Sequence, residues 1–269
     1  MARLERIHVY PVKSLDGTTV ETTSIRDRGG TEWDRRYAIV DEDGTYVNGK
    51  GERAVHRLRA SYDLERKTIT VRKQGSDDPF SFHLDVDRDA FASWLTCFFG
   101  YEVDVVRADE GGFPDDTDAA GPTIISSGTL EAVASWFDGI DPAEMRRRLR
   151  PNLVVGETEP FWEDRLYDRP GTTVPFEIGS SRLEGVNPCQ RCVVPTRDPD
   201  TGEPTDGFRE RFVDRREATL PEWANPAWFD HYYRLMVNTR VPERVWGDRL
   251  TVGDPVVVEP HRESSATLR

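Results

Sequence analysis

Lysine, cysteine and histidine are scarce in this sequence, and long apolar runs are missing. Four lysines stand against thirty-two arginines, with three cysteines and five histidines in 269 residues. No apolar stretch approaches the roughly 18 residues that cross a bilayer, and Met1–Arg6 lacks the apolar segment of a secretory signal. Three cysteines do not make the paired framework of small secreted proteins. We therefore expect a cytoplasmic protein without a membrane span.

Several common functional motifs are also missing. The sequence contains neither a Gly-x-x-x-x-Gly-Lys phosphate loop nor a Gly-x-Ser-x-Gly nucleophile turn. The histidines are scattered without metal-site spacing. The run Asp198–Gly202 resembles a calcium loop, but its glycine comes one place early and Arg209 stands where a bidentate glutamate belongs. These absences argue against a nucleotide-binding loop, a serine hydrolase and a calcium site.

The charge balance is strongly acidic, with a formal net charge of −13. An acidic surface with little lysine is typical of proteins adapted to high internal salt, where screening makes self-repulsion tolerable. High-GC codon usage explains the same composition equally well. Under either interpretation a nucleic-acid partner is not expected, because such a partner needs a basic face.

Short strand patterns outnumber helical ones in both halves, which predicts a mainly β protein with α additions, of the α+β class. In the first half the expected strands are Arg3–Val12, Thr18–Ile25, Arg36–Asp41, Thr45–Val47, Lys67–Arg72, Phe80–Leu84 and Glu102–Arg107, and a helix should run from Asp87 to Phe99. In the second half the expected helices are Thr129–Phe137 and Pro142–Leu149, and the expected strands are Leu153–Gly156, Thr173–Ile178, Arg182–Val186, Arg191–Thr196, Val241–Trp246 and Leu250–Val258. A helical or irregular stretch should cover Trp223–Met236.

A segment rich in glycine, aspartate and proline, residues 108–121, is typical of a surface linker. It divides the chain into an N-terminal domain, 1–107, and a second domain, 122–260, with a tail at 261–269. We expect the N-terminal domain to be barrel-like and to pack on a second β-barrel.

Of the three cysteines, one stands apart, and the other two form a pair that allows three interpretations. Cys97 lies in an apolar stretch and is expected to be a small core residue. Cys189 and Cys192 form a Cys-x-x-Cys pair, which could belong to a zinc knuckle, a redox dithiol or a single-thiolate metal site. A zinc knuckle needs more ligands than the chain offers, and a dithiol pair should open a helix, which Pro195 disfavours. A single thiolate on a soft, high-valent metal is favoured, with Arg191 promoting ionisation of the Cys192 sulfur.

Four ordered motifs carry a family resemblance. The pair Cys189–Cys192 is followed by Asp198-Pro199-Asp200-Thr201-Gly202; the other motifs are Tyr10–Ser14, Leu149–Val155 and Val252–Val256. Together they resemble the MOSC-domain family, which includes reductases of amidoximes and of N-hydroxylaminopurines. The resemblance implies a MOSC N-terminal β-barrel domain followed by a MOSC domain.

The resemblance also implies a cofactor and its ligands. It makes Cys192 the catalytic residue and the protein ligand of molybdenum in a molybdopterin cofactor. Cofactor-binding residues implied with it are Lys13, Ser14, Arg35, Arg150, Asn152, Gln190, Arg191 and Tyr232. Arginine and lysine suit a dianionic phosphate. Thr196 and Asp198 are candidates for hydrogen bonds that orient the metal ligand, and Cys189 is expected to be a packing residue. Ala120-Gly121 stand where relatives carry Thr-Ser, so a contact there should come from backbone amides.

Three functions follow from these expectations. The leading one is reduction of the N–O bond in N-hydroxylated small molecules, with electrons from a separate donor protein of the ferredoxin, flavoprotein or cytochrome type. A second is a sulfur carrier or cofactor-presenting protein without reductase turnover. A third is a β-barrel binding module without catalysis.

Overall fold

The largest sheet of the protein is built from both ends of the chain. The structure is a computed structural model, which describes residues 1–258. In that range the sheet has eight strands, in the spatial order β15 (Val256–Val258), β11 (Val174–Ile178), β12 (Ser181–Gln190), β13 (Arg234–Arg240), β9 (Ile124–Ser126), β10 (Leu153–Gly156), β1 (Arg3–Val9) and β2 (Thr18–Val20). Strands β9 and β10 are parallel; the other neighbours are antiparallel.

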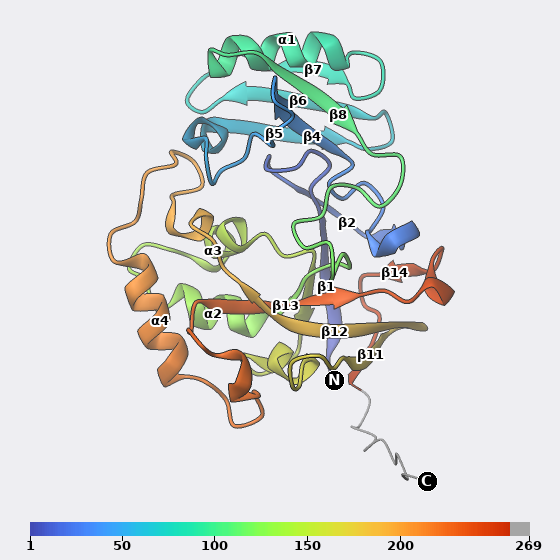
Figure 1. The fold of residues 1–269 in the computed structure, drawn as a ribbon, viewed down its shortest axis with the longest axis vertical. Coiled ribbons are helices and arrows are strands. Elements are labelled where there is room, and N and C mark those ends of the chain that lie inside the picture. The colour runs from blue at the N-terminus through green and yellow to red at the C-terminus, as the bar shows by residue number, and fades with distance from the viewer. Residues whose placement is uncertain (259–269) are drawn as a thin grey trace.

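The first strand of the chain is buried in this sheet, next to the edge strand β2. Residues Leu4, Ile7 and Val9 of β1 are fully buried, and β1 pairs with β10, about 150 residues further on. The core beside β1 includes residues of β11, β12 and β13, such as Phe176, Leu183 and Val237. We call the part of the molecule that contains this eight-stranded sheet the lower lobe, and the part above it in Figure 1 the upper lobe. The N-terminal strand therefore belongs to the lower lobe, together with the strands of the second half of the chain (Figure 1).

The upper lobe holds two smaller sheets and one helix (Figure 1). The pair β4 (Tyr37–Asp41) and β8 (Val103–Arg107) is antiparallel, as is the three-stranded sheet β5 (Leu58–Asp63), β6 (Thr68–Lys73) and β7 (Phe80–His83). Helix α1 (Arg88–Phe99) ends at Gly100, which adopts the left-handed conformation of a helix C-terminus. Phe91 and Leu95 of α1 lie one helical turn apart and pack with Ile69 and Val105 into a separate core.

The remaining helices cover the lower lobe. These are α2 (Ser127–Ala134), α3 (Pro142–Leu149) and α4 (Phe208–Ala218), and β14 (Arg249–Thr251) pairs with β3 (Thr22–Ser24) at the side. Ser126 caps α2 by accepting from the Thr129 amide, and Asp141 caps α3 by accepting from the Glu144 amide. Short 3₁₀ turns occur at Asp27–Gly29, Arg53–Arg57, Trp162–Leu166, Val194–Thr196, Pro226–Trp228 and Glu243–Val245.

The expected α and β mixture is confirmed, with some local errors. The predicted strand Arg191–Thr196 is wrong, because β12 already ends at Gln190 and Pro195 falls in a 3₁₀ turn. The predicted strand Val241–Trp246 is also a 3₁₀ turn, and the irregular stretch to Met236 contains the start of β13. Strands β5, β9 and β13 and helix α4 were not predicted. Helix α4 has a narrow apolar stripe, Phe208 and Phe212 among charged residues, which gives little helical signal.

The segment 108–121 runs between the two lobes without a helix or strand. Gly111 and Gly112 have positive φ, which glycine adopts without strain. No helix among residues 1–258 is long and apolar enough to cross a bilayer. The expected tail 261–269, and residues 259 and 260, lie outside the described residues.

Candidate active site between the two lobes

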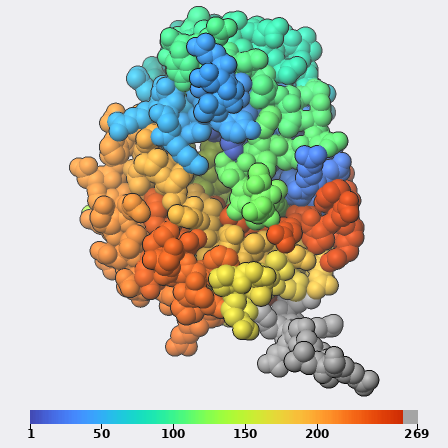
Figure 2. All heavy atoms as spheres, in the orientation of Figure 1, coloured from blue at the N-terminus to red at the C-terminus, as the bar shows by residue number. Residues whose placement is uncertain are grey.

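A large cavity of about 1110 Å³ lies between the lobes. Figure 2 shows the surface hollowed where the upper lobe meets the segments of the lower one. Twelve lysine and arginine side chains line the cavity against five aspartates, although the whole protein has a net charge of −13. Two of the four lysines, Lys13 and Lys50, are among them. The cavity is therefore a cationic site within an acidic protein, which suits an anionic ligand.

Cys192 lies in the wall of this cavity, in the loop after β12. Its side chain is half-buried, and its Sγ accepts a hydrogen bond from the Val194 amide at 3.5 Å. The loop then turns at Pro195, and Arg148 of α3 donates to the Pro195 carbonyl at 3.0 Å. Arg148 is itself buried and paired with Glu144 at 2.7 Å. A buried arginine, paired with the half-buried Glu144, thus holds the loop that presents the Cys192 sulfur.

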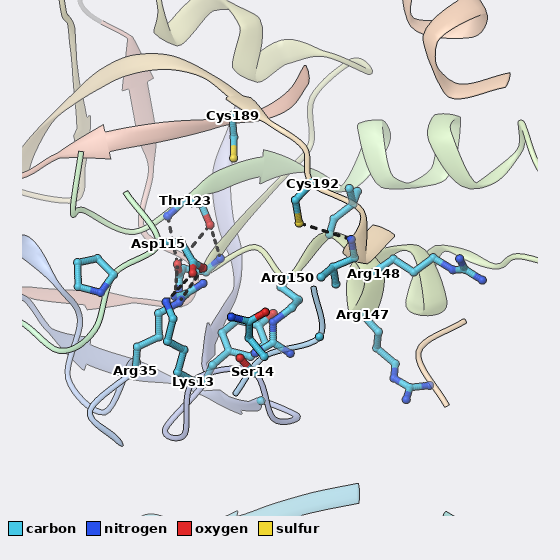
Figure 3. Close-up of a pocket in the computed structure, with 18 of the residues that line it drawn as sticks. Lys13, Ser14, Arg35, Asp115, Thr123, Arg147, Arg148, Arg150, Cys189 and Cys192 are labelled. Carbon is cyan, nitrogen blue, oxygen red and sulfur yellow. Dashed lines mark hydrogen bonds and ion pairs between the residues drawn. The ribbon is translucent and has the colours of Figure 1, made fainter. Parts of the chain in front are cut away.

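The neighbouring Arg191 contacts the other cysteine. Its Nη1 donates to Cys189 Sγ at 3.2 Å, and its Nη2 donates to the Leu149 carbonyl at 2.9 Å. Its Nε is buried without a partner among the described residues. Cys189 also lines the cavity (Figure 3). The guanidinium expected beside the Cys192 sulfur therefore hydrogen-bonds to Cys189 instead, which gives Cys189 a polar contact where packing alone was expected.

Lys13 and Arg35 meet at one carboxylate, Asp115, on one side of the cavity (Figure 3). Lys13 Nζ lies 2.5 Å from Asp115 Oδ1, and Arg35 Nε lies 3.5 Å from Asp115 Oδ2. Arg35 also pairs with its neighbour Asp34. Burial lowers the pKa of Lys13, and Asp115 opposes that effect. Burial raises the pKa of Asp115, but Arg35 and Lys13 outweigh it and hold that pKa well below its usual range.

Asn152 joins this group to the sheet. Its Oδ1 accepts from the amide and the hydroxyl of Thr123, both at 3.2 Å, and from Arg35 Nη1 at 3.4 Å. Its Nδ2 donates to the His8 carbonyl at 3.2 Å. Since both amide atoms already have protein partners, Asn152 acts in this structure as a support that orients Arg35.

Arg150 reaches the cavity from the end of α3. Its guanidinium lies 4.1 Å from the centre of the Tyr10 ring, a cation–π contact, and it has no carboxylate partner among the described residues. Arg150 has φ 57°, and Ser14 and Arg35 have φ 78° and 49°. Non-glycine residues adopt this left-handed region rarely, and such residues gather at functional sites. Three residues implied as cofactor ligands therefore share a strained backbone around one cavity.

The Asp-Pro-Asp-Thr-Gly run forms a turn that connects the two lobes beside the cavity. Asp198 Oδ1 accepts from the amides of Asp200 and Thr201 at 2.9 and 2.8 Å, which closes the turn. Asp200 then binds Arg147 of α3 at 2.6 Å and Arg59 of β5 at 2.8 Å. Because Arg59 belongs to the upper lobe, Asp200 ties the two lobes together beside the cavity.

Comparison with known proteins agrees with this architecture. Residues 1–139 match the MOSC N-terminal beta barrel domain, and residues 122–257 match the MOSC domain. The chain belongs to the MOSC family. It is 26% identical to mitochondrial amidoxime reducing component 2 of Bos taurus, over 94% of this chain and 82% of the relative.

Two further likenesses are more distant. Molybdenum cofactor sulfurase of Bos taurus is 22% identical over 80% of this chain, which matches 29% of that longer protein. The crystal structure of the YUAD protein from Bacillus subtilis covers 97% of both chains at a TM-score of 0.36 and 11% identity, a likeness too low to bear on function.

Most of the residues implied by the MOSC resemblance come together. The cavity is lined by Lys13, Ser14, Arg35, Arg150, Asn152, Gln190, Arg191 and Cys192. Tyr232 does not line it; its ring stacks on Phe229 at 5.5 Å, and Trp228 lines the cavity instead. No group of three or more His, Cys, Asp or Glu residues within 1–258 could hold a metal ion. Any metal in this MOSC site would depend on few protein ligands.

Other lining residues were not anticipated. Asp115, in the segment expected to be a surface linker, is one, and Arg59, Arg147 and Arg197 are others. Arg147 and Arg197 flank predicted motifs, so proximity in sequence was an available signal; Arg59 and Asp115 had none. The expectation for Cys97 was wrong: its side chain is exposed on α1, because Phe91 and Leu95 occupy the buried face. The Gly121 amide donates to the Thr239 carbonyl at 2.9 Å, so a protein partner already occupies it.

Proposed function

We propose that this MOSC protein binds a molybdenum cofactor through the Cys192 thiolate and reduces the N–O bond of N-hydroxylated small molecules. The observation that carries the proposal is that one cavity is lined both by Cys192 and by the cations Lys13, Arg35 and Arg150. The names of the amidoxime reducing relatives support the reaction class.

The donor set fits an anionic, planar cofactor. A half-buried thiol in the wall of a cavity without clustered carboxylates or histidines suits a soft metal more than calcium, magnesium or zinc. The buried, unpartnered Nε of Arg191 leaves a hydrogen-bond donor for a ligand at the cysteine end. The volume of about 1110 Å³ exceeds the range of roughly 300–1,000 Å³ typical of small-molecule sites. There is room for a cofactor and a substrate together.

Different residues would bind the phosphate of the cofactor and position the Cys192 thiolate. Arg150 offers a guanidinium without a carboxylate partner for bidentate contact with a phosphate, and Lys13 supplies a point charge. Arg148 and Val194 hold the Cys192 loop in place. A bound molybdenum cofactor supplies two-electron redox chemistry. Reduction of an N–OH group consumes two electrons and two protons and yields an N–H group and water. A separate electron-donor protein, of the ferredoxin, flavoprotein or cytochrome type, completes the proposal.

The proposal is tested by metal content and by the two cysteines. Protein made in a cofactor-competent host should contain molybdenum by elemental analysis and should reduce benzamidoxime with a chemical reductant. Cys192→Ser should lower the activity by more than about a hundredfold, because loss of a direct metal ligand should cost more than the roughly 10–100-fold that loss of a residue supporting a ligand costs. Cys189→Ser is the matched control, since it removes a thiol from the same cavity. Equal losses in both variants would favour a dithiol or zinc site.

A second candidate rests on the likeness to molybdenum cofactor sulfurase. In this alternative the chain carries sulfur on a cysteine, or presents the cofactor, without reductase turnover. A carrier would release sulfur to cyanide from a Cys192 persulfide and would not turn over an amidoxime. Reductase turnover without cyanide-releasable sulfur would exclude it.

A further inference from the structure

The cations of the cavity fall into two groups. Lys13 and Arg35 are paired with Asp115 and Asp34, and Arg59 and Arg147 are paired with Asp200. Lys50 and Arg197 also line the cavity, yet neither has a carboxylate within ion-pair distance among residues 1–258. Their charges are therefore uncompensated within the part of the chain that the structure describes.

Arg197 is held by neutral groups only. Its Nη1 donates to the Gly49 carbonyl at 2.5 Å and its Nη2 donates to the Lys50 carbonyl at 3.2 Å. A guanidinium carries five N–H donors, so others stay available to a ligand. The two contacts join the upper-lobe loop that holds Lys50 to the lower-lobe loop that holds Cys192. They place Arg197 beside the backbone of Lys50, whose side chain is exposed and lines the same cavity.

The pair lies within electrostatic reach of the proposed reaction centre. Burial and Arg53 lower the pKa of Arg197, and the Cys192 sulfur opposes them. Lys50 in turn helps to lower the pKa of Lys13, after burial and Arg35. Glu52, two residues after Lys50 in the chain, binds other groups: it accepts from the Ala54 amide at 2.8 Å and from the Tyr101 hydroxyl at 3.4 Å.

Resting on the proposed function, we propose that Lys50 and Arg197 form an anion subsite that selects N-hydroxylated substrates carrying a negatively charged group such as a carboxylate. A planar carboxylate matches the guanidinium fork of Arg197, and the long, flexible side chain of Lys50 would bring a second positive charge to it from the adjoining loop. The subsite is separate from the cations that Asp115 and Asp34 neutralise, so cofactor and substrate would draw on different charges.

The experiment compares two substrates that differ by one charge. Full-length protein loaded with cofactor reduces benzamidoxime or 4-carboxybenzamidoxime with a chemical reductant, so that docking of a donor protein does not enter. The wild type should prefer the carboxylated substrate in kcat/KM. Arg197→Gln and Lys50→Gln should each lower the ratio of the two kcat/KM values by about tenfold, as loss of a charge-assisted hydrogen bond does. The ratio cancels any loss of folded or loaded protein.

The control and a binding measurement separate the possible failures. Arg244→Gln removes the same charge from an exposed position outside the cavity and should leave the ratio unchanged. Calorimetric titration of the oxidised protein with each amidoxime should show tighter binding of the carboxylated one, with the difference reduced in both subsite variants. A ratio and a binding difference that do not change in Arg197→Gln and Lys50→Gln would overturn the subsite. If neither amidoxime is reduced, the proposed function fails, and the titration still tests the subsite.

Discussion

Two regions of the molecule gather charged side chains, and they handle charge in opposite ways. The cavity between the lobes is open to solvent and has an excess of cations. The other region lies in the core of the lower lobe, where Glu163, Asp164 and Arg216 are almost fully buried. There Arg216 Nη2 pairs with Asp164 Oδ2 at 2.6 Å, and the guanidinium lies 4.7 and 5.2 Å from the ring centres of Phe161 and Phe229.

The difference shows what solvent access does to unbalanced charge. In the cavity, water screens the surplus cations, so they stay charged and available to a ligand. In the core the second acid is removed from solvent by burial. Burial, together with the neighbouring Asp164, raises the pKa of Glu163 to about 7. The core therefore removes its excess charge by protonation, whereas the cavity keeps its excess.

Breaking the buried pair should have the largest effect on stability. Arg216→Met leaves the Asp164 carboxylate buried without its partner, which should lower the free energy of unfolding by about 3–5 kcal/mol. Urea denaturation followed by tryptophan fluorescence measures this. Arg215→Met is the matched control on the exposed side of the same helix and should change stability by less than about 0.5 kcal/mol.

A second substitution sharpens that test. If the loss comes from an unpaired charge, Asp164→Leu combined with Arg216→Met should recover part of the stability, because the remaining charge is gone. A loss of less than about 1 kcal/mol in Arg216→Met alone would mean that Asp164 is protonated even when paired.

Glu163 predicts a pH dependence of stability. Its pKa of about 7 lies above the ordinary value of 4.5, so the folded state binds the proton more tightly than the unfolded state. That contribution is fully present below about pH 4.5 and is lost as the pH rises through about 7. We expect the free energy of unfolding to fall by about 2 kcal/mol between pH 5 and pH 8.

The variant Glu163→Gln separates this residue from every other titrating group. The glutamine oxygen can still accept from the Thr129 hydroxyl, which lies 2.9 Å from Glu163 Oε2. In urea denaturation from pH 5 to pH 8 its stability should decline less than that of the wild type. A decline of the same size in both proteins would assign the slope to other groups.

The same contrast explains how much could be predicted from the sequence. Local motifs were sufficient for the mixed fold and for eight of the residues that line the cavity: the Tyr10–Ser14 run and the cysteine pair are recognisable within a few residues. The pairing of β1 with β10 could not be predicted, because it joins segments about 150 residues apart. Nor could the Arg216–Asp164 pair, since each residue resembles an ordinary surface charge in the sequence.

The segment 108–121 contributes to the cavity in a way that its composition does not indicate. Its composition is typical of a linker, and the structure does give it no helix or strand. However, Asp115 approaches both Lys13 and Arg35, and the Phe113 carbonyl accepts from Lys13 Nζ at 3.0 Å. Composition predicts that a segment is irregular, but it does not predict which of its side chains contact residues far away in the sequence. A contact of this kind is therefore found only in the three-dimensional structure.

The smallest expected effect is at Asp115, whose substitution tests whether the cations of the open cavity are available to a ligand. Its carboxylate lies between Lys13 and Arg35, two of the cations that bind the anionic cofactor under the proposed function, and its side chain is 60% exposed at the cavity. Asp115→Asn should therefore strengthen the binding of inorganic phosphate by about threefold, a modest gain because water screens the site. Titration calorimetry with phosphate measures it.

The control is its neighbour, Asp116→Asn. Asp116 lines the same cavity and accepts from Asn238 Nδ2 at 3.2 Å, but it pairs with no lysine or arginine in residues 1–258. The two variants change the net charge equally, so a general electrostatic effect should raise phosphate binding in both. A gain confined to Asp115→Asn means that this aspartate competes with the ligand. Weaker binding in Asp115→Asn means instead that the carboxylate is needed to orient Lys13 and Arg35, and that the open cavity, like the core, depends on its ion pairs.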